Sequence, residues 1–113
     1  MPPFEKERQY YRSRIPPGDV AVFRVGGHQM AIREVSERGF RYDPAPGHKP
    51  ELDTQLTGVV AFKTIGEIEV SGKFLRVQEK SLVIVLDPPG IPYAMILALQ
   101  QFLMKRYPGR VNG

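Results

Sequence analysis

Three residues near position 36 have types and a spacing that suit recognition of a polar ligand. Glu34, Ser36 and Gly39 follow one another in "REVSERGF" as an acid, a hydroxyl and a glycine. A carboxylate accepts hydrogen bonds, and serine can donate or accept one. Glycine permits either a positive φ or a close approach of the backbone to a ligand. The set therefore suits half of a binding site, although the same pattern is also typical of a turn that ends a strand.

A second set of residues lies near the N-terminus, where Arg8 and Arg12 in "RQYYR" have the spacing R-x-x-x-R. Arginine can hold a phosphate or a guanine edge with its planar fork, and its face stacks on a purine. This spacing is common by chance, and Arg106 and Arg110 repeat it. A binding site is favoured by where the two sets lie along the chain. Arg8 and Arg12 precede the first expected strand, and the acid–serine–glycine set lies at the end of the second expected strand. Arg14, just past the pair, is a weaker candidate for a phosphate contact.

The composition is that of one folded domain of 113 residues. The chain has no cysteine, which excludes disulfides and thiolate metal sites. His28 and His48 are distant in sequence and lack a carboxylate at ligand spacing, so we expect no metal site. The N-terminus lacks the apolar segment of a signal peptide, and no apolar run is long enough for a bilayer span. We therefore expect a cytoplasmic protein without membrane insertion.

The net charge of +4 is concentrated at the two ends of the chain. Residues 1–14 carry +2 and residues 105–113 carry +3, whereas residues 15–104 carry −1. This distribution favours a small anionic ligand gripped by a terminal segment over a nucleic acid polymer tracked along a groove. A small barrel that binds single-stranded nucleic acid is the alternative, but it would need exposed aromatics alternating with cations on its strands.

The pattern of strands predicts a flexible arm over residues 1–17 and a folded unit over residues 18–108. Six short β-branched and aromatic runs, separated by glycine and proline, predict a small closed barrel or sandwich. Gly26-Gly27 predicts a hairpin turn, the break in alternation at Phe74 and Leu75 predicts a bulge, and "SLVIVLD" should be the most buried strand. The spacing of apolar residues predicts a helix over about 91–106.

With these residues in place, the chain resembles the PilZ domain family, bacterial receptors for cyclic di-GMP (c-di-GMP). Arg8 and Arg12 match the family's R-x-x-x-R, and Glu34, Ser36 and Gly39 match its D/N-x-S-x-x-G, with Glu34 departing from Asp or Asn. The resemblance covers nearly the whole chain and implies an all-β fold: a six-stranded antiparallel β-barrel with one C-terminal helix. It also implies that these five residues bind c-di-GMP; Arg14, which is not part of the family motif, is added as a weaker candidate from its position alone.

The function implied by the resemblance is that of a c-di-GMP receptor. The sequence shows no nucleophile–base pair and no clustered carboxylates, so we expect no catalytic activity, cofactor or metal. Binding would order the arm and signal to an unidentified protein partner in the control of motility, exopolysaccharide or pili. The alternative is an adaptor that has lost nucleotide binding, with Glu34 as the sign of that loss. Its working surface would be the C-terminal helix, where Leu97 and Met104 fall outside the apolar stripe. A homodimer through this helix is a further hypothesis.

Overall fold

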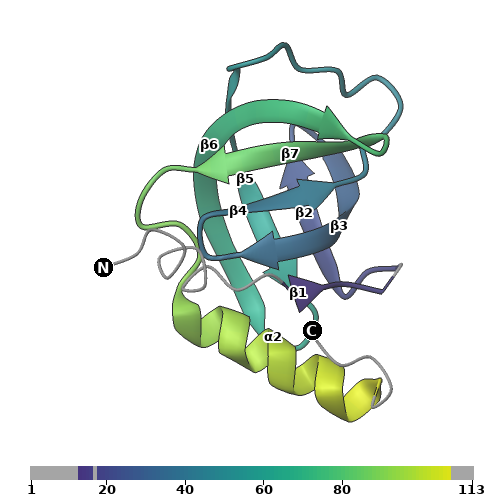
Figure 1. Ribbon diagram of the computed structural model, residues 1–113, viewed down its shortest axis with the longest axis vertical. Helices are drawn as coiled ribbons and strands as arrows, with labels where there is room; N and C mark the ends of the chain where they lie inside the picture. Colours follow the sequence, from purple (N-terminus) through teal and green to yellow (C-terminus); the bar gives the residue numbers. More distant parts are fainter. Residues whose placement is uncertain (1–12, 17, 108–113) are drawn as a thin grey trace, which may run out of the picture.

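Seven strands and one helix make up the part of the chain that the computed structural model describes, residues 13–16 and 18–107 (Figure 1). In chain order they are β1 (Ser13–Arg14), β2 (Ala21–Val25), β3 (His28–Ser36), β4 (Gly39–Tyr42), β5 (Gln55–Phe62), β6 (Gly66–Gln78), β7 (Ser81–Leu86) and α2 (Tyr93–Arg106). Most neighbours are joined by tight turns. Gly26 and Gly27 both have positive φ between β2 and β3, which confirms the predicted hairpin turn.

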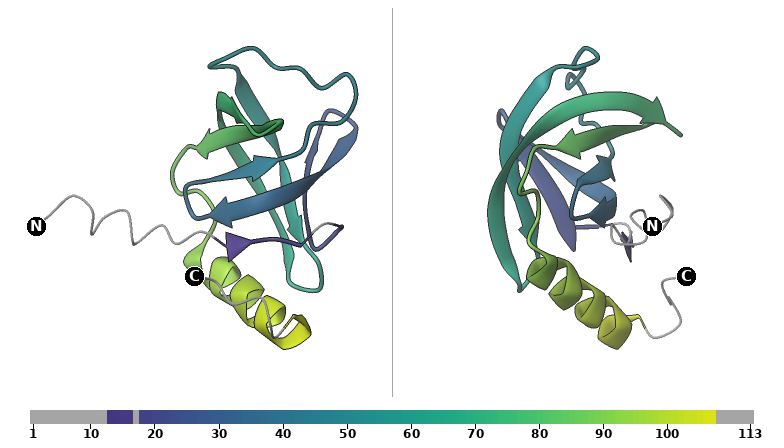
Figure 2. Two further views of the ribbon diagram at one scale, coloured as in Figure 1. Left: turned by 45° about the vertical axis from the view of Figure 1, so that its right-hand side comes forward. Right: turned by 60° about the vertical axis from the view of Figure 1, so that its left-hand side comes forward.

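Six of the strands close into an antiparallel barrel. The order of pairing is β3-β2-β5-β6-β7-β4, and a further pairing of β3 with β4 closes the ring. Figure 2 shows from two sides how the long β6 curves around the barrel, pairing first with β5 and then with β7. This confirms the expected fold class of a six-stranded barrel with one C-terminal helix.

The short strand β1 adds to the barrel along one edge of β3. Ser13 lies opposite Val35 and Arg14 opposite Glu34, on the edge of β3 that pairs with β2 nearer its start. The Ile15 amide then donates to the Arg33 carbonyl at 2.9 Å. Within the described residues the sheet therefore begins at Ser13, inside the range 1–17 that the sequence assigned to the arm.

The barrel interior is filled by alternate residues of its strands. Phe23, Phe40 and Tyr42 form an aromatic group at its centre, with ring centroids 4.9 to 5.7 Å apart and tilted or edge-to-face geometry. The bulge predicted in β6 is confirmed by a register shift between Phe74 and Arg76. Four of the six residues of β7 are buried, a larger share than in any other strand, which confirms the expectation that it is the most buried strand, although its outward Val85 is 42% exposed.

The helix α2 lies across one end of the barrel, and the loop between β4 and β5 lies at the opposite end (Figure 1). The inward residues of α2, Ile96, Leu99 and Leu103, are buried in the same core as the barrel residues. The side-chain amide of Gln100 donates to the Ser13 hydroxyl at 3.1 Å and so links α2 to β1. Over residues 13–16 and 18–107, no helix is long and apolar enough to cross a membrane.

Candidate functional site

The acid–serine–glycine set lies where β3 turns into β4. Ser36 ends β3 and Gly39 begins β4, and these two residues pair with each other in the closing ladder. The Ser36 hydroxyl donates to the Gly39 carbonyl at 3.3 Å and accepts from the Arg38 amide at 3.4 Å. The serine therefore ties the turn to its own backbone, which is the role expected of a serine in a turn that ends a strand.

Gly39 has a reason of its own for being glycine. Its φ lies outside the left-handed region, but a Cβ built on it would lie 2.4 Å from the carbonyl oxygen of Ile84. No real Cβ makes a contact of that length, so the approach of β4 to β7 requires glycine here. The sequence had suggested a positive φ or an approach to the ligand; the close approach that the structure shows is to a neighbouring strand.

Glu34 is largely buried and forms ion pairs on both sides. Its Oε2 lies 3.8 Å from Nε of Arg14 on β1 and 3.5 Å from NH2 of Arg41 on β4. The Glu34 and Arg41 side chains are 16% and 17% exposed, whereas Arg14 is 82% exposed. Solvent screens a contact with so exposed a partner, so Arg41 is the stronger neighbour of the carboxylate.

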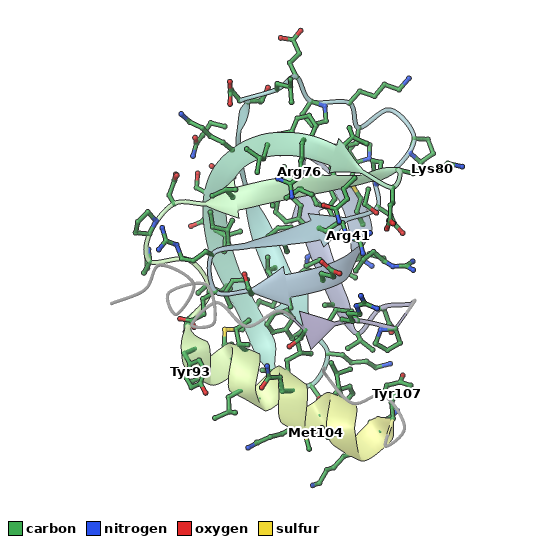
Figure 3. All side chains as sticks on the ribbon, in the orientation of Figure 1. Arg41, Arg76, Lys80, Tyr93, Met104 and Tyr107 are labelled. Carbon is green, nitrogen blue, oxygen red and sulfur yellow. The ribbon has the colours of Figure 1, made fainter. Side chains whose placement is uncertain are left out.

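These side chains belong to one row that crosses five strands on the outside of the barrel. The register places Arg14 beside Glu34, Glu34 beside Arg41, Arg41 beside Val83, and Val83 beside Arg76. Residues directly opposite in neighbouring strands share a face, and here it is the outer face because the flanking residues of β4 point inward. Arg41 and Arg76 stand on this face in Figure 3. In this row the Glu34 carboxylate lies between two arginines, and Val83 lies between Arg41 and Arg76.

Arg41 is the residue of this site that was not predicted from the sequence. The signal was present, because Gly39 and Arg41 alternate with the inward Phe40 and Tyr42 along "GFRY". Strand alternation would have placed Arg41 on the face of Gly39. Its place next to Glu34 follows from the register in which Ser36 pairs with Gly39.

The turn between Ser36 and Gly39 is supported from behind by the segment that leads from β7 into α2. The Leu86 amide donates to the Arg38 carbonyl at 2.8 Å, and the Ile91 amide donates to the Glu37 carbonyl at 2.9 Å. At Gly90 a Cβ would lie 2.1 Å from the same Glu37 carbonyl oxygen, so the backbones touch. The geometry of this turn is thus coupled to the start of the helix.

The arginine pair Arg8 and Arg12 lies outside the described residues. The described chain begins at Ser13, the residue directly after Arg12, and Ser13 pairs with Val35 between Glu34 and Ser36. It therefore starts beside the acid–serine–glycine set.

A separate polar group lies near the other end of the barrel and brings together two histidines that the sequence did not connect. The rings of His28 and His48 have centroids 5.7 Å apart, and Nε2 of His48 lies 2.8 Å from the hydroxyl of Tyr42. Burial, followed by the charge of His28, lowers the pKa of His48. Within residues 13–16 and 18–107, no three acidic or histidine side chains are placed to hold a metal ion.

Comparison with known proteins shows a similarity in fold. No protein-family model matches the sequence, and no curated protein gives a significant match. Among solved structures, the chain is similar to the PlzA protein of Borreliella burgdorferi, crystallised in complex with c-di-GMP, with a TM-score of 0.50 and 19% identity. The alignment covers 83% of this chain and 41% of PlzA, so the chain spans less than half of that protein. At this identity the similarity shows a shared fold.

Proposed function

We propose that this protein is a c-di-GMP receptor that binds the dinucleotide on the outer face of β3 and β4. One observation carries the proposal: β1, which directly follows Arg12, pairs with β3 next to Glu34 and Ser36. The described chain therefore starts, one residue after Arg12, beside an acidic and a hydroxyl side chain. The similarity in fold to a protein crystallised with c-di-GMP supports the choice of ligand.

In this proposal the chemistry of the site divides between the two motifs. Arg8 and Arg12 hold a phosphate or the O6 and N7 edge of a guanine, with Arg14 as a lesser phosphate contact. Glu34 accepts from N1–H and N2–H of a guanine, two donors that arginine, which has no acceptor, cannot serve. Ser36 holds the turn in shape, and Gly39 lets β4 lie close to β7.

The output of such a receptor is a change of surface rather than a reaction. Closing the arm on the ligand alters what a protein partner meets beside β1, β3 and α2. The receptor needs no cofactor of its own. Its partner belongs to a process such as motility, exopolysaccharide or pili, the roles that the resemblance to the PilZ family implies.

Calorimetric titration with c-di-GMP tests the proposal. The wild-type chain should bind with micromolar or tighter affinity, and Arg8→Ala and Arg12→Ala should each weaken binding by about tenfold or more, as expected for a charge-assisted contact. Arg110→Ala is the matched control, since it removes an arginine of the second R-x-x-x-R pair and should leave the affinity unchanged. No heat at high ligand concentration, with a folded protein, would refute the proposal.

The second candidate function is that of an interaction adaptor, and the outer side of α2 favours it. Tyr93, Leu97 and Met104 are 58%, 38% and 60% exposed, an unusual display of large apolar side chains on one helix. Tyr93 and Met104 are labelled on the helix in Figure 3. A homodimer through this surface would appear as a doubled mass in light scattering and would be lost in Leu97→Glu. Dimerisation together with no detectable binding of c-di-GMP would favour the adaptor over the receptor.

A further inference from the structure

The pair formed by Glu34 and Arg41 joins two side chains that the register places directly opposite each other. Both are more than four-fifths buried, and NH2 of Arg41 lies 3.5 Å from Oε2 of Glu34. An ion pair in such a place is a weak source of stability, because removing two charges from water costs nearly as much as their attraction returns. A role in orienting one partner accounts for it better.

Arg41 is anchored on its other side, away from Glu34. Its NH1 donates to the Ser81 hydroxyl at 3.1 Å, and Ser81, which is 2% exposed, donates in turn to Asp43 at 2.6 Å. Asp43 is itself paired with Arg33 at 3.2 Å. The guanidinium is therefore held by a chain of contacts that runs from β7 back to β3.

One hydrogen-bond donor of Arg41 has no acceptor in this arrangement. Its Nε is buried and has no hydrogen-bond partner among the described residues. A buried donor without a partner is unfavourable, so the hydrogen bonds of Arg41 itself do not fully account for an arginine at this position. The guanidinium at this position is explained by what it does to Glu34.

We propose that Arg41 is a positioning residue of the ligand site, which fixes the Glu34 carboxylate in the orientation that accepts from a guanine edge. This inference rests on the proposed function. Glutamate has one more rotatable bond than the aspartate typical of the PilZ motif, so its carboxylate loses more freedom when a ligand binds. Holding it in place beforehand removes that cost from binding.

The inference makes the preference for guanine depend on Arg41. A carboxylate fixed against the N1–H and N2–H edge distinguishes c-di-GMP from its inosine analogue, which lacks the exocyclic amine. The phosphates of the two dinucleotides are identical, so contacts from Arg8 and Arg12 to phosphate favour neither. The ratio of the two affinities therefore reports on Glu34 and its orientation rather than on charge in general.

The experiment is calorimetry of both dinucleotides on the full chain and on Arg41→Gln, Glu34→Gln and the double variant. Arg41→Gln should weaken c-di-GMP binding by about tenfold and reduce its preference over the inosine analogue. In the Glu34→Gln background the same change should alter binding by no more than about twofold, because Arg41 acts through Glu34. Arg41→Lys keeps the charge but cannot reach Ser81 and Glu34 together, so it should behave like Arg41→Gln.

Arg24→Gln is the matched control, since Arg24 lies on β2 outside this row, carries the same charge and pairs with Glu67 instead. Its effect should stay within about twofold. Equal losses in Arg24→Gln and Arg41→Gln, or equal losses with and without Glu34, would overturn the inference while leaving the receptor intact. Failure of the wild type to bind would overturn both. If thermal scans show that Arg41→Gln does not fold, Arg41→Lys completes the same cycle.

Discussion

Tyr42 and His48 form a contact in which one partner is fixed and the other can titrate. Burial raises the pKa of Tyr42 to about 12, so its hydroxyl stays protonated at any ordinary pH and can donate to a neutral His48. Burial and the neighbouring His28 lower the pKa of His48 below its usual 6.5. The folded chain therefore favours neutral His48.

The free energy of unfolding should consequently depend on pH through His48. Between pH 6.5 and the lowered pKa, the unfolded chain binds a proton at this position and the folded chain does not. The stabilising contribution is thus complete above pH 6.5 and is lost as the pH falls through the lowered pKa. Urea unfolding at a series of pH values should show this decline in the wild type and a smaller one in His48→Gln. Identical pH profiles would contradict the assignment.

The segment between β7 and α2 shows how one backbone contact can govern a neighbouring element. Gly90 has a φ of +73° and lies against the Glu37 carbonyl, whereas Gly47 has a φ of +88° and nothing near its missing Cβ. The two glycines share a conformation and differ only in their surroundings. Comparing alanine substitutions at the two positions therefore separates the energy of the left-handed backbone from the energy of the steric contact with Glu37.

Gly90→Ala should therefore destabilise the chain more than Gly47→Ala. Each alanine costs about 1–2 kcal/mol for the left-handed backbone, and Gly90→Ala adds roughly 1–3 kcal/mol because the Cβ has no space. Chemical denaturation of both variants measures the difference. Equal losses would show that Glu37 yields to the new methyl group and that the turn is not tightly held.

The hairpin between β6 and β7 places two residues other than glycine in the left-handed region. Glu79 and Lys80 adopt φ values of 51° and 70°, where the β2–β3 hairpin uses two glycines. The double substitution Glu79→Asn with Lys80→Gly introduces residues that tolerate positive φ, and should raise the free energy of unfolding by on the order of 1 kcal/mol. Urea unfolding measures this change. The reciprocal double substitution, Gly26→Glu with Gly27→Lys, should lower the free energy of unfolding. A loss of stability in the first variant would contradict the turn geometry.

At the scale of the whole molecule, α2 is part of the core rather than an appendage. Leu99 is fully buried against the barrel, whereas Leu97, two residues earlier on the same helix, is 38% exposed. Leu99→Ala should cost about 2–5 kcal/mol because it leaves a cavity, and Leu97→Ala should cost within about 1 kcal/mol. A single thermal transition lowered strongly only in Leu99→Ala would agree. Similar effects of the two changes would mean that the helix packs loosely.

Much of this architecture could be predicted from local signals in the sequence. Three predictions rest on short-range preferences, and the structure confirms them: the turn at Gly26-Gly27, the bulge at Phe74 and the helix that ends near Lys105. What the sequence could not supply was register. The outward position of Val85 and the pairing of Ser13 with Val35 depend on how distant strands align.

The candidate site divides in the same way. Glu34, Ser36 and Gly39 were found by spacing, because all three lie close together in sequence on one hairpin. Arg41 stands opposite Glu34, but the network that holds it includes Ser81, 40 residues further along the chain. The meeting of His28 and His48 is likewise a property of the closed barrel and its loop.

The most direct test of where the ligand binds is an NMR titration of the isotope-labelled chain with c-di-GMP. The account predicts that amide shifts move at Glu34 to Arg41, at Ser13 and Arg14, and at the outward residues of β7. The β5–β6 turn around Thr64 should stay unchanged. Shifts confined to α2 or to that turn, or no shifts at all at saturating ligand, would contradict the account.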